Sequence, residues 1–516
     1  MKRQNRTRKK PSNLRAGGCG QPPLLVCCYY VFKEIIMEFT LPPGPNIILE
    51  KMSEDGFSCY LVGGSVRDML RCHEPSDYDF VTNRSPEQII AVATNAGWKV
   101  WQHGIAFGVV NVLLQGISYE IATMRTESYG ADPHRPDTVE FVDDIVQDLS
   151  RRDFTINAMA MDGQGRIIDP FGGQDDLKKG IIRCVGFPRE RFMEDPLRVL
   201  RAARFISKTG FTAEPGITSS IQDEKILRRF AALSVERVRD ELEKILLSPH
   251  PSRGLRFLVK TGILGRSCRV RKGREREAVP ILPEIEVMQG VRQNPRFHAY
   301  DVLEHTLQVV EGIPPQLILR WAALLHDVSK GKAGTRCLNK RGEIADYGHA
   351  SAGAKLARQI MERLRVSLET ITRVVWLVKN HMVVPGVDDK RMARWVKKHS
   401  RDFKDRETFT EATQQLFLLA DADNRARGKT IDETYIQVVT DSFQRVMAQT
   451  VLYPAELNIS GDYLVQKLGK GPQVGKVMRD LLIDVQTGQL TNSNEVLQTA
   501  VNKKAKRYKQ STLLNN

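Results

Sequence analysis

The hydrophobic pattern of this chain changes abruptly near Pro196. Before that residue, short apolar runs at 59–62 and 78–81 alternate with helical segments and with turn residues. After it, apolar residues recur at intervals of three and four, as at 197–207 and 235–247, which is the pattern of amphipathic helices. The sequence therefore predicts an α/β head followed by an all-α region.

Composition limits the class of protein. The chain has 516 residues, of which 41% are hydrophobic and 27% are charged, as in an ordinary globular protein. No apolar run reaches the ~18 residues of a membrane-spanning helix. The eight cysteines are scattered and include no C-x-x-C pair, which favours reduced thiols and a cytoplasmic protein over a disulfide framework or a zinc ribbon.

The net charge of +16 favours a polyanionic partner, with nucleic acid first and an anionic membrane surface second. Most of this charge lies near the two ends of the chain. Residues 1–36 hold eight basic residues and one acid, and five basic residues follow Glu495. We expect residues 1–36 to be a disordered extension or a misassigned start, because no small-residue cleavage site follows their short apolar run.

A glycine turn and a pair of aspartates form the first group of functional candidates. Gly64 lies in a turn between an expected strand and the start of a helix, where backbone amides can approach an anion closely. Asp77 and Asp79 point to the same side of the next expected strand, which suits two Mg²⁺ ions that activate a hydroxyl and stabilise a leaving pyrophosphate. Glu120, on the following hairpin, is either a third carboxylate of this site or a solvent-facing strand residue.

Two groups of arginines follow. Arg151 and Arg152 precede an amphipathic segment, and paired guanidinium groups can contact a triphosphate bidentately. Further on, one carboxylate and three arginines share one side of an expected helix: Asp195, Arg198, Arg201 and Arg204. Because a carboxylate only accepts hydrogen bonds and a guanidinium only donates them, such a set can read the edge of a base while the other arginines face phosphates.

In combination these motifs resemble the class II tRNA nucleotidyltransferase family, which comprises the CCA-adding enzymes and their poly(A) polymerase relatives. The matching stretches, GGSVRD with DYD, RRDFTINAMA, DPFGGQDDL and EDPLRVLRAARF, lie within residues 57–210. The resemblance implies a polymerase-β-like head that uses Mg²⁺, CTP and ATP to extend tRNA without a template. It assigns Mg²⁺ binding to Asp77 and Asp79. It assigns the nucleotide-binding roles to Gly64, Arg67, Arg152, Asp195, Arg198, Arg201 and Arg204, with Glu194 holding Asp195 and Arg198 in place.

The polar segment 123–137 resembles the flexible loop of the same family. CC-only enzymes of similar pattern lack this loop. Its presence therefore implies that the chain also adds the terminal A.

Histidines and acids mark a second candidate site in the helical half. His326 and Asp327 end an apolar helix, His305 lies in a preceding helix, and Asp421 lies in a later one. Mixed imidazole and carboxylate ligands suit Mn²⁺, Ni²⁺, Fe²⁺ or Mg²⁺.

Over residues 295–425 this second pattern resembles the HD phosphohydrolase superfamily, with the four residues above as its ligand set. His349 and His381 match accessory ligand positions. The resemblance implies 2′,3′-cyclic phosphodiesterase and phosphatase activity, and the alternative is an inactive helical scaffold.

RNA-binding surfaces are less specific in the sequence. The charge-rich connector at 266–277 and the basic segment 390–398 are candidates for contact with phosphates, although each is also typical of a solvated charged face. Residues 459–488 resemble the family's C-terminal helical region.

The sequence thus predicts five segments: a leader (1–36), a nucleotidyltransferase head (37–180), a helical neck and body (181–290), an HD domain (291–425) and a helical C-terminal region with a basic tail (426–516). The favoured function is CCA addition to tRNA, with no membrane partner. An A-adding tRNA nucleotidyltransferase or a poly(A) polymerase is the alternative in the same class. An HD phosphohydrolase or RNA-binding protein with an inactive head is the alternative of another class, and the intact pair of aspartates argues against it.

Overall fold

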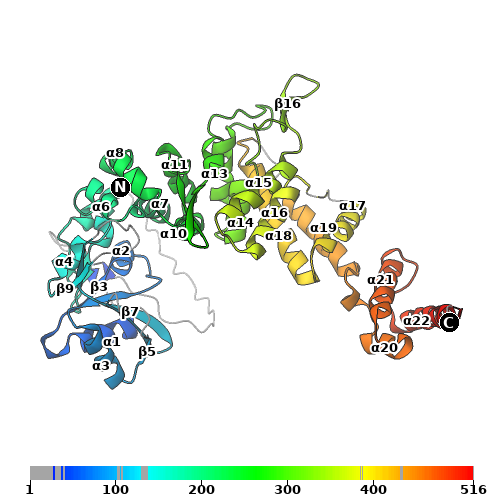
Figure 1. Cartoon of the computed structure of the whole chain (residues 1–516), viewed down its shortest axis with the longest axis horizontal. Coiled ribbons are helices and arrows are strands. Elements are labelled where there is room, and N and C mark those ends of the chain that lie inside the picture. Colours follow the sequence, from blue (N-terminus) through cyan, green and yellow to red (C-terminus); the bar gives the residue numbers. More distant parts are fainter. Residues whose placement is uncertain are drawn as a thin grey trace, which may run out of the picture. The chain divides into compact units, whose positions relative to one another are not determined.

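The structure is a computed structural model that describes residues 27–28, 37–38, 41–101, 105, 108–128, 138–383, 385, 388–429 and 434–514. The chain divides into two compact units, Met1–Phe187 and Pro188–Asn516, and Figure 1 labels their elements. Nearly all of the leader and residues 129–137 of the polar loop lie outside the described residues. None of the helices in the described ranges is both long and apolar enough to cross a membrane.

A mixed sheet forms the centre of the first unit, with the strand order β11-β10-β3-β4-β7-β6-β5. β4 and β7 run parallel, whereas the other neighbours run antiparallel. The strands are β3 (Cys59–Val62), β4 (Asp79–Thr82), β5 (Lys99–Trp101), β6 (Val109–Leu114), β7 (Ile117–Thr123), β10 (Ala160–Met161) and β11 (Ile167–Ile168). A second small sheet pairs β8 (Arg125–Ser128) with β9 (Thr138–Phe141).

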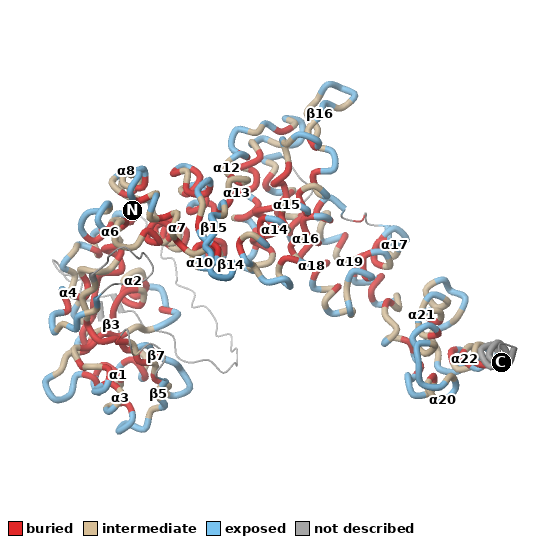
Figure 2. The backbone as a smooth tube through the Cα atoms, in the orientation of Figure 1, coloured by how far each residue is buried: buried red, intermediate tan, exposed pale blue. Residues whose placement is uncertain are grey.

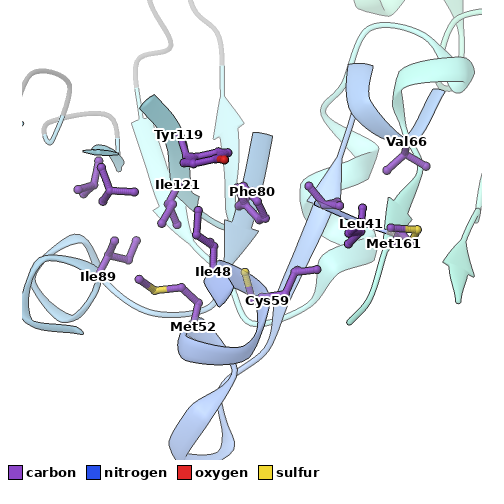
Figure 3. Packing of buried hydrophobic residues seen from close by; sticks show 14 of the residues in the cluster. Leu41, Ile48, Met52, Cys59, Val66, Phe80, Ile89, Tyr119, Ile121 and Met161 are labelled. Atoms are coloured by element: carbon purple, nitrogen blue, oxygen red, sulfur yellow. The ribbon is translucent and has the colours of Figure 1, made fainter. Parts of the chain in front are cut away.

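Each face of the central sheet carries its own apolar cluster. On one face, Ile48 and Ile89 pack against Phe80 and Ile121 of the strands, as Figure 3 shows. Side chains alternate along a strand, so the neighbours of Phe80 point to the opposite face, where Val81 belongs to a second apolar cluster.

The head helices are α1 (Pro43–Met52), α2 (Gly64–Leu70), α3 (Pro86–Asn95), α4 (Ile145–Ser150) and α5 (Gly173–Lys179).

The second unit is mainly helical, and Figure 2 shows buried residues along α7 and α10 as well as along α13 to α16 and α18. Its helices are α6 (Pro188–Glu194), α7 (Arg198–Thr209), α8 (Pro215–Ile221), α9 (Glu224–Phe230), α10 (Val235–Leu247), α11 (Pro251–Lys260), α12 (Pro283–Glu286), α13 (Val302–Gly312), α14 (Leu317–Leu325), α15 (His349–Arg363), α16 (Leu368–Asn380), α17 (Asp389–His399), α18 (Arg406–Arg425), α19 (Tyr435–Gln449), α20 (Gly461–Leu468), α21 (Pro472–Gln486) and α22 (Asn494–Leu514). The last three have a hydrophobic cluster of their own, which includes Leu464, Leu481 and Leu497.

Two antiparallel hairpins interrupt the helices of the second unit. β14 (Ser267–Lys272) pairs with β15 (Glu275–Pro280), and β16 (Arg336–Leu338) pairs with β17 (Ile344–Asp346). The segment expected as a charged connector is therefore a regular hairpin. Cys268 and Val270 are buried at alternate positions of β14, and this period of two was hidden among charged residues.

Candidate functional site

Strand register brings the glycine turn and the carboxylates of the head together. Val62, where β3 ends and the turn begins, is the register partner of Asp79 at the start of β4. Asp79 is in turn the register partner of Glu120 on the parallel strand β7. Directly paired residues point to the same face of a sheet. Asp79 and Glu120 therefore present their carboxylates side by side, one strand apart.

The electrostatics of Asp79 indicate a crowded negative site. Burial, and then the charges of Asp77 and Glu120, raise the pKa of Asp79 to about 6, and Arg152 opposes this rise. Asp77 precedes β4 and is exposed. Three carboxylates that repel one another fit a hard divalent cation with oxygen ligands, such as Mg²⁺.

The turn after β3 is shaped around two arginines. Gly63 has a φ of 70°, and a Cβ added there would lie 3.0 Å from Nη1 of Arg152. Arg67 is only 2% exposed. Its Nη1 donates to Asn157 Oδ1 at 2.6 Å, and its Nε donates to Asp68 Oδ1 at 2.8 Å. Arg152 thus lies against the turn, whereas Arg67 holds the turn in place, and its direct contact with a nucleotide stays a prediction.

The arginine pair is anchored by one buried acid. Asp148 is fully buried and pairs with Arg151 at 2.7 Å and with Arg152 at 3.1 Å. Although burial raises the pKa of Asp148, the two guanidinium groups hold it below its ordinary value. Arg151 also pairs with Glu127 at 2.9 Å. The two arginines therefore differ, because Arg151 is tied to two acids and Arg152 faces the glycine turn.

The group predicted to read the base, Asp195 with Arg198, Arg201 and Arg204, lies in the second unit. The single helix expected to carry all four residues is interrupted. α6 ends at Glu194 and α7 begins at Arg198, so Asp195 lies in the turn between them. Glu194 pairs with Arg198, as expected. Asp195 is instead paired with Arg237 of α10 at 3.1 Å, a residue that the sequence analysis did not single out.

The three arginines of this group lie on α7 but do not share one side of it. Arg198 is buried, whereas Arg201 and Arg204 are half-buried. Arg204 pairs with Glu241 of α10 at 3.2 Å. A spacing of three residues turns by about 300° on a helix, so each successive arginine is displaced by about 60° from the one before.

The second candidate site is a buried cluster centred on Asp327, which lies two residues after the end of α14 and is 1% exposed. Four imidazole Nε2 atoms surround its carboxylate: His326 at 3.2 Å and His305 at 3.6 Å from Oδ2, and His349 at 3.4 Å and His381 at 3.8 Å from Oδ1. They form two groups with closely placed ligand atoms that share Asp327: His305 with His326, and His349 with His381.

Each of these imidazoles is oriented by a backbone carbonyl. Nδ1 contacts Ala426 O at 3.2 Å in His305, Ala323 O at 2.8 Å in His326, Asp346 O at 2.7 Å in His349 and Val378 O at 2.8 Å in His381. Such contacts leave Nε2 free to bind a metal. Among the described residues, Oδ1 of Asp327 is buried without a hydrogen-bond donor. The donor set and this unpaired buried oxygen fit a divalent cation.

The protonation states of His381 and Asp327 also favour ligation at this cluster. Burial, and then His326 beside it, lower the pKa of His381 to about 4, so its imidazole is neutral and able to bind a metal near pH 7. Although burial alone raises the pKa of Asp327, His326 and Lys330 hold it well below its ordinary value. Asp327 is therefore the ionised centre of the cluster.

The predicted fourth ligand, Asp421, does not join the cluster. It faces outward from α18 and accepts a hydrogen bond from Arg425 at 2.9 Å. Asp423 is 5% exposed, and its Oδ1 lies 3.1 Å from Nε2 of His305. Two residues turn by about 200° on a helix, so these aspartates point in nearly opposite directions. The buried stripe Leu416, Leu419, Ala420 and Asp423 of α18 was the signal that could have identified the right one.

Two further residues of the cluster were missed. The ring of His298 lies edge-on to that of His305, with centroids 4.9 Å apart. Burial, and then the charge of Lys330, lower the pKa of His298 to about 3. Lys330 Nζ lies 2.6 Å from Oδ2 of Asp327. His298 comes from an irregular segment before α13, where no periodicity pointed to it.

Three family models match the chain. The model described as the poly A polymerase head domain matches residues 59–183. A probable RNA and SrmB-binding site of polymerase A matches residues 210–266. The HD domain matches residues 297–428.

Curated relatives match both parts of the chain. The CCA-adding enzyme of Ligilactobacillus salivarius is 46% identical over 293 residues, which cover 57% of this chain and 70% of that protein. The A-adding tRNA nucleotidyltransferase of Deinococcus radiodurans is 34% identical over 439 residues, which cover 82% of this chain and 90% of that protein. The CCA-adding enzyme of Lactobacillus johnsonii is 44% identical over 216 residues, or 42% of this chain, so that the match spans about half, 53%, of its length.

A solved structure matches the fold of nearly the whole chain. It is the Bacillus stearothermophilus CCA-adding enzyme in complex with CTP, with a TM-score of 0.62 and 24% identity, and the match covers 91% of this chain and 100% of that one. The predicted order of an α/β nucleotidyltransferase head, then a helical body with an HD domain, is therefore confirmed.

Proposed function

Because the chain belongs to the tRNA nucleotidyltransferase and poly(A) polymerase family, we propose that it adds CCA to the 3′ end of tRNA from CTP and ATP. The observation that carries the proposal is the register of β3, β4 and β7. It aligns the glycine turn with Asp79 and Glu120. A phosphate-binding turn beside crowded carboxylates is what nucleotidyl transfer requires, since a triphosphate and its cations must meet there.

In this reaction the terminal 3′-hydroxyl of the RNA attacks the α-phosphorus of the nucleotide, and pyrophosphate leaves. Asp77 and Asp79 would hold Mg²⁺, with Glu120 as a third carboxylate beside them. When bound, these ions activate the hydroxyl and neutralise the charge of the leaving group. Arg152 and the backbone amides at Gly64 would bind the triphosphate.

We infer that base selection falls to protein groups of α7 and of the turn before it. Asp195 accepts hydrogen bonds and Arg198 donates them, so the two can pair with the edge of a base. Glu194 and Arg237 hold these groups by ion pairs, which fixes their directions before a nucleotide arrives. The match of residues 210–266 to an RNA-binding model supports an RNA as the second substrate.

An A-adding activity is the alternative in the same class. The match to the A-adding enzyme of Deinococcus radiodurans covers 82% of this chain, more than the 57% covered by the match to the CCA-adding enzyme of Ligilactobacillus salivarius. The comparison therefore supports both specificities. Incorporation of CTP is what separates them.

The deciding experiment supplies three tRNA transcripts, ending before C, after C and after CC, with labelled CTP or ATP. CCA addition predicts CTP incorporation on the first two and ATP incorporation on the third. Incorporation of ATP alone, on the third transcript only, would replace the proposal by A addition. Long runs of A on any RNA would identify a poly(A) polymerase.

We propose a phosphohydrolase activity for the HD domain as a second function. Its support is the cluster around Asp327, in which two histidine pairs share one buried carboxylate. His305, His326, Asp327 and Asp423 would hold one divalent cation, and His349 and His381 would hold another together with Asp327. Bound cations supply charge neutralisation and an activated water at a phosphoester. Hydrolysis of 2′,3′-cyclic AMP to adenosine monophosphate, or release of phosphate from p-nitrophenyl phosphate, in Mn²⁺ or Ni²⁺ tests this, and an Asp327→Asn variant that is equally active would refute it.

A further inference from the structure

The hairpin β14–β15 separates its charges by face. In its register Arg271 lies opposite Arg276, and Arg269 lies opposite Ala278. Side chains alternate along each strand, so these residues share one face. The complete set of positions on this face is Ser267, Arg269, Arg271, Arg276, Ala278 and Pro280. It holds three arginines and no acid.

The acids of the hairpin lie on the other face. There Lys272 pairs with Glu277 at 2.6 Å, and Lys272 is also the register partner of Glu275. Cys268 and Val270 are buried on that face. The acids of the hairpin therefore do not balance the positive charge on the face that carries the three arginines.

The three arginines are also exposed. Arg271 Nε donates to Gly273 O at 3.0 Å, and Arg269 Nη1 donates to Arg276 O at 3.1 Å. Within the described part of the chain, no ion pair to an acid involves Arg269, Arg271 or Arg276. Like charges directly opposite each other destabilise a strand pair. An anion bound from outside would offset this repulsion.

We propose that this arginine face binds the phosphate backbone of the tRNA. Arginine contacts phosphate bidentately, and tRNA is the polyanion that the proposed reaction supplies, so the inference rests on the proposed function. The face offers no aromatic ring for stacking on a base and no large apolar side chain for insertion into a membrane surface. Its contacts are therefore with phosphates, without regard to the tRNA sequence.

The test removes the three charges together. In the triple variant Arg269→Gln, Arg271→Gln, Arg276→Gln, the slope of log binding constant against log salt concentration for tRNA should fall in magnitude by about 2 to 3. At low salt, KM for tRNA should rise about tenfold, whereas kcat at saturating tRNA and KM for CTP stay unchanged. The charge-matched control is Lys340→Gln, Arg341→Gln, Lys355→Gln, which removes three exposed cations elsewhere in the same unit and should bind as the wild type does.

A second variant separates charge from structure. With Lys at all three positions, the salt slope should stay close to that of the wild type, because the charges are kept. The Gln variant should melt at the wild-type temperature or above it, since the repulsion between Arg271 and Arg276 is gone. Equal loss of binding in the Lys and Gln variants, or a control that loses as much as the Gln variant, would overturn the inference.

A wild-type slope in the Gln variant would also overturn it. If Lys390→Gln, Arg391→Gln, Arg394→Gln on α17 then lowered the slope, the phosphate contacts would lie on that helix. These outcomes differ from failure of the proposed function, in which the wild-type protein itself incorporates no nucleotide into tRNA.

Discussion

The two candidate metal sites are built in opposite ways. In the head, the carboxylates come from neighbouring strands of one sheet, and Asp77 and Glu120 are exposed. In the HD domain, the ligands come from α13, α14, α15, α16 and α18, or from the residues that follow them, and His305 and His326 have no exposed surface.

The difference reflects what each site has to admit. A site that accepts a nucleotide and the end of an RNA, and that releases pyrophosphate, must stay open to solvent. A buried site whose carboxylates Asp327 and Asp423 are held ionised among imidazoles instead retains a cation, because an unpaired buried charge is costly. We therefore expect the two sites to respond independently to substitution, to chelation and to pH.

The largest effect is expected from Asp79→Asn. The substitution removes a charged ligand while keeping the shape of the side chain, so CTP incorporation should fall roughly 1,000-fold or more, beyond the ~10- to 100-fold typical of outer-shell changes. Rates of incorporation into a tRNA transcript measure this. Asp327→Asn is the matched control and should leave incorporation unchanged. A shared loss would show that the two sites are coupled.

A smaller effect separates the two aspartates of α18. Asp423→Asn should weaken Mn²⁺ binding to the HD domain by roughly 100-fold, since it removes a carboxylate beside His305. Asp421→Asn should change it less than about twofold, because that side chain faces Arg425. Calorimetric titration with Mn²⁺ measures both. Equal effects would contradict the placement of Asp423 in the cluster.

Metal binding should also stabilise the helical unit. Mn²⁺ at about 100 times its dissociation constant should raise the free energy of unfolding by about 2.7 kcal/mol. The matching rise in melting temperature should disappear with EDTA and in Asp327→Asn. An equal rise in that variant would place the stabilising ion elsewhere.

The smallest effect concerns pH in the head. The pKa of Asp79 is raised to about 6, so this carboxylate takes up a proton as the pH falls through that value and then binds Mg²⁺ less well. The Mg²⁺ concentration required for half-maximal incorporation should therefore rise by up to about tenfold per pH unit below 6. Rates measured at several Mg²⁺ concentrations from pH 5 to 8 give this dependence.

Glu120→Gln sharpens that measurement. It removes one of the charges that raise the pKa of Asp79. The pH below which the required Mg²⁺ concentration rises should therefore be lower than in the wild type. The control Glu140→Gln, an exposed change on β9, should leave that pH unchanged. The same pH in Glu120→Gln as in the wild type would mean that Glu120 does not face Asp79.

The head site was largely predictable because its parts are close in sequence and follow strand geometry. Asp77 and Asp79 are two residues apart, which places them on one side of an extended segment whatever surrounds them. The place of Glu120 depended on which strand pairs with β4. Asp148, the buried acid that anchors both arginines, gave no signal because a single acid in a short helix is ordinary.

The sequence indicated which types of residue form the HD site, but it did not settle which individual residues belong to it. The pair His326-Asp327 at the end of an apolar helix was enough to indicate the cluster. The choice between Asp421 and Asp423 depended on which side of α18 packs inward. His298 comes from an irregular segment, whose path is set by tertiary packing alone.

The sequence by itself determined the order of an α/β head and a helical body, and the paired aspartates of the head, because hydrophobic periodicity and i, i+2 spacing act locally along the chain. Only the tertiary structure decided the register of Asp79 with Glu120, the partners Arg237 and Asp148, and the face of the hairpin that carries the arginines. These depend on contacts between segments distant in sequence. Burial then selects which of several equivalent polar residues can be paired, and no local pattern encodes that choice.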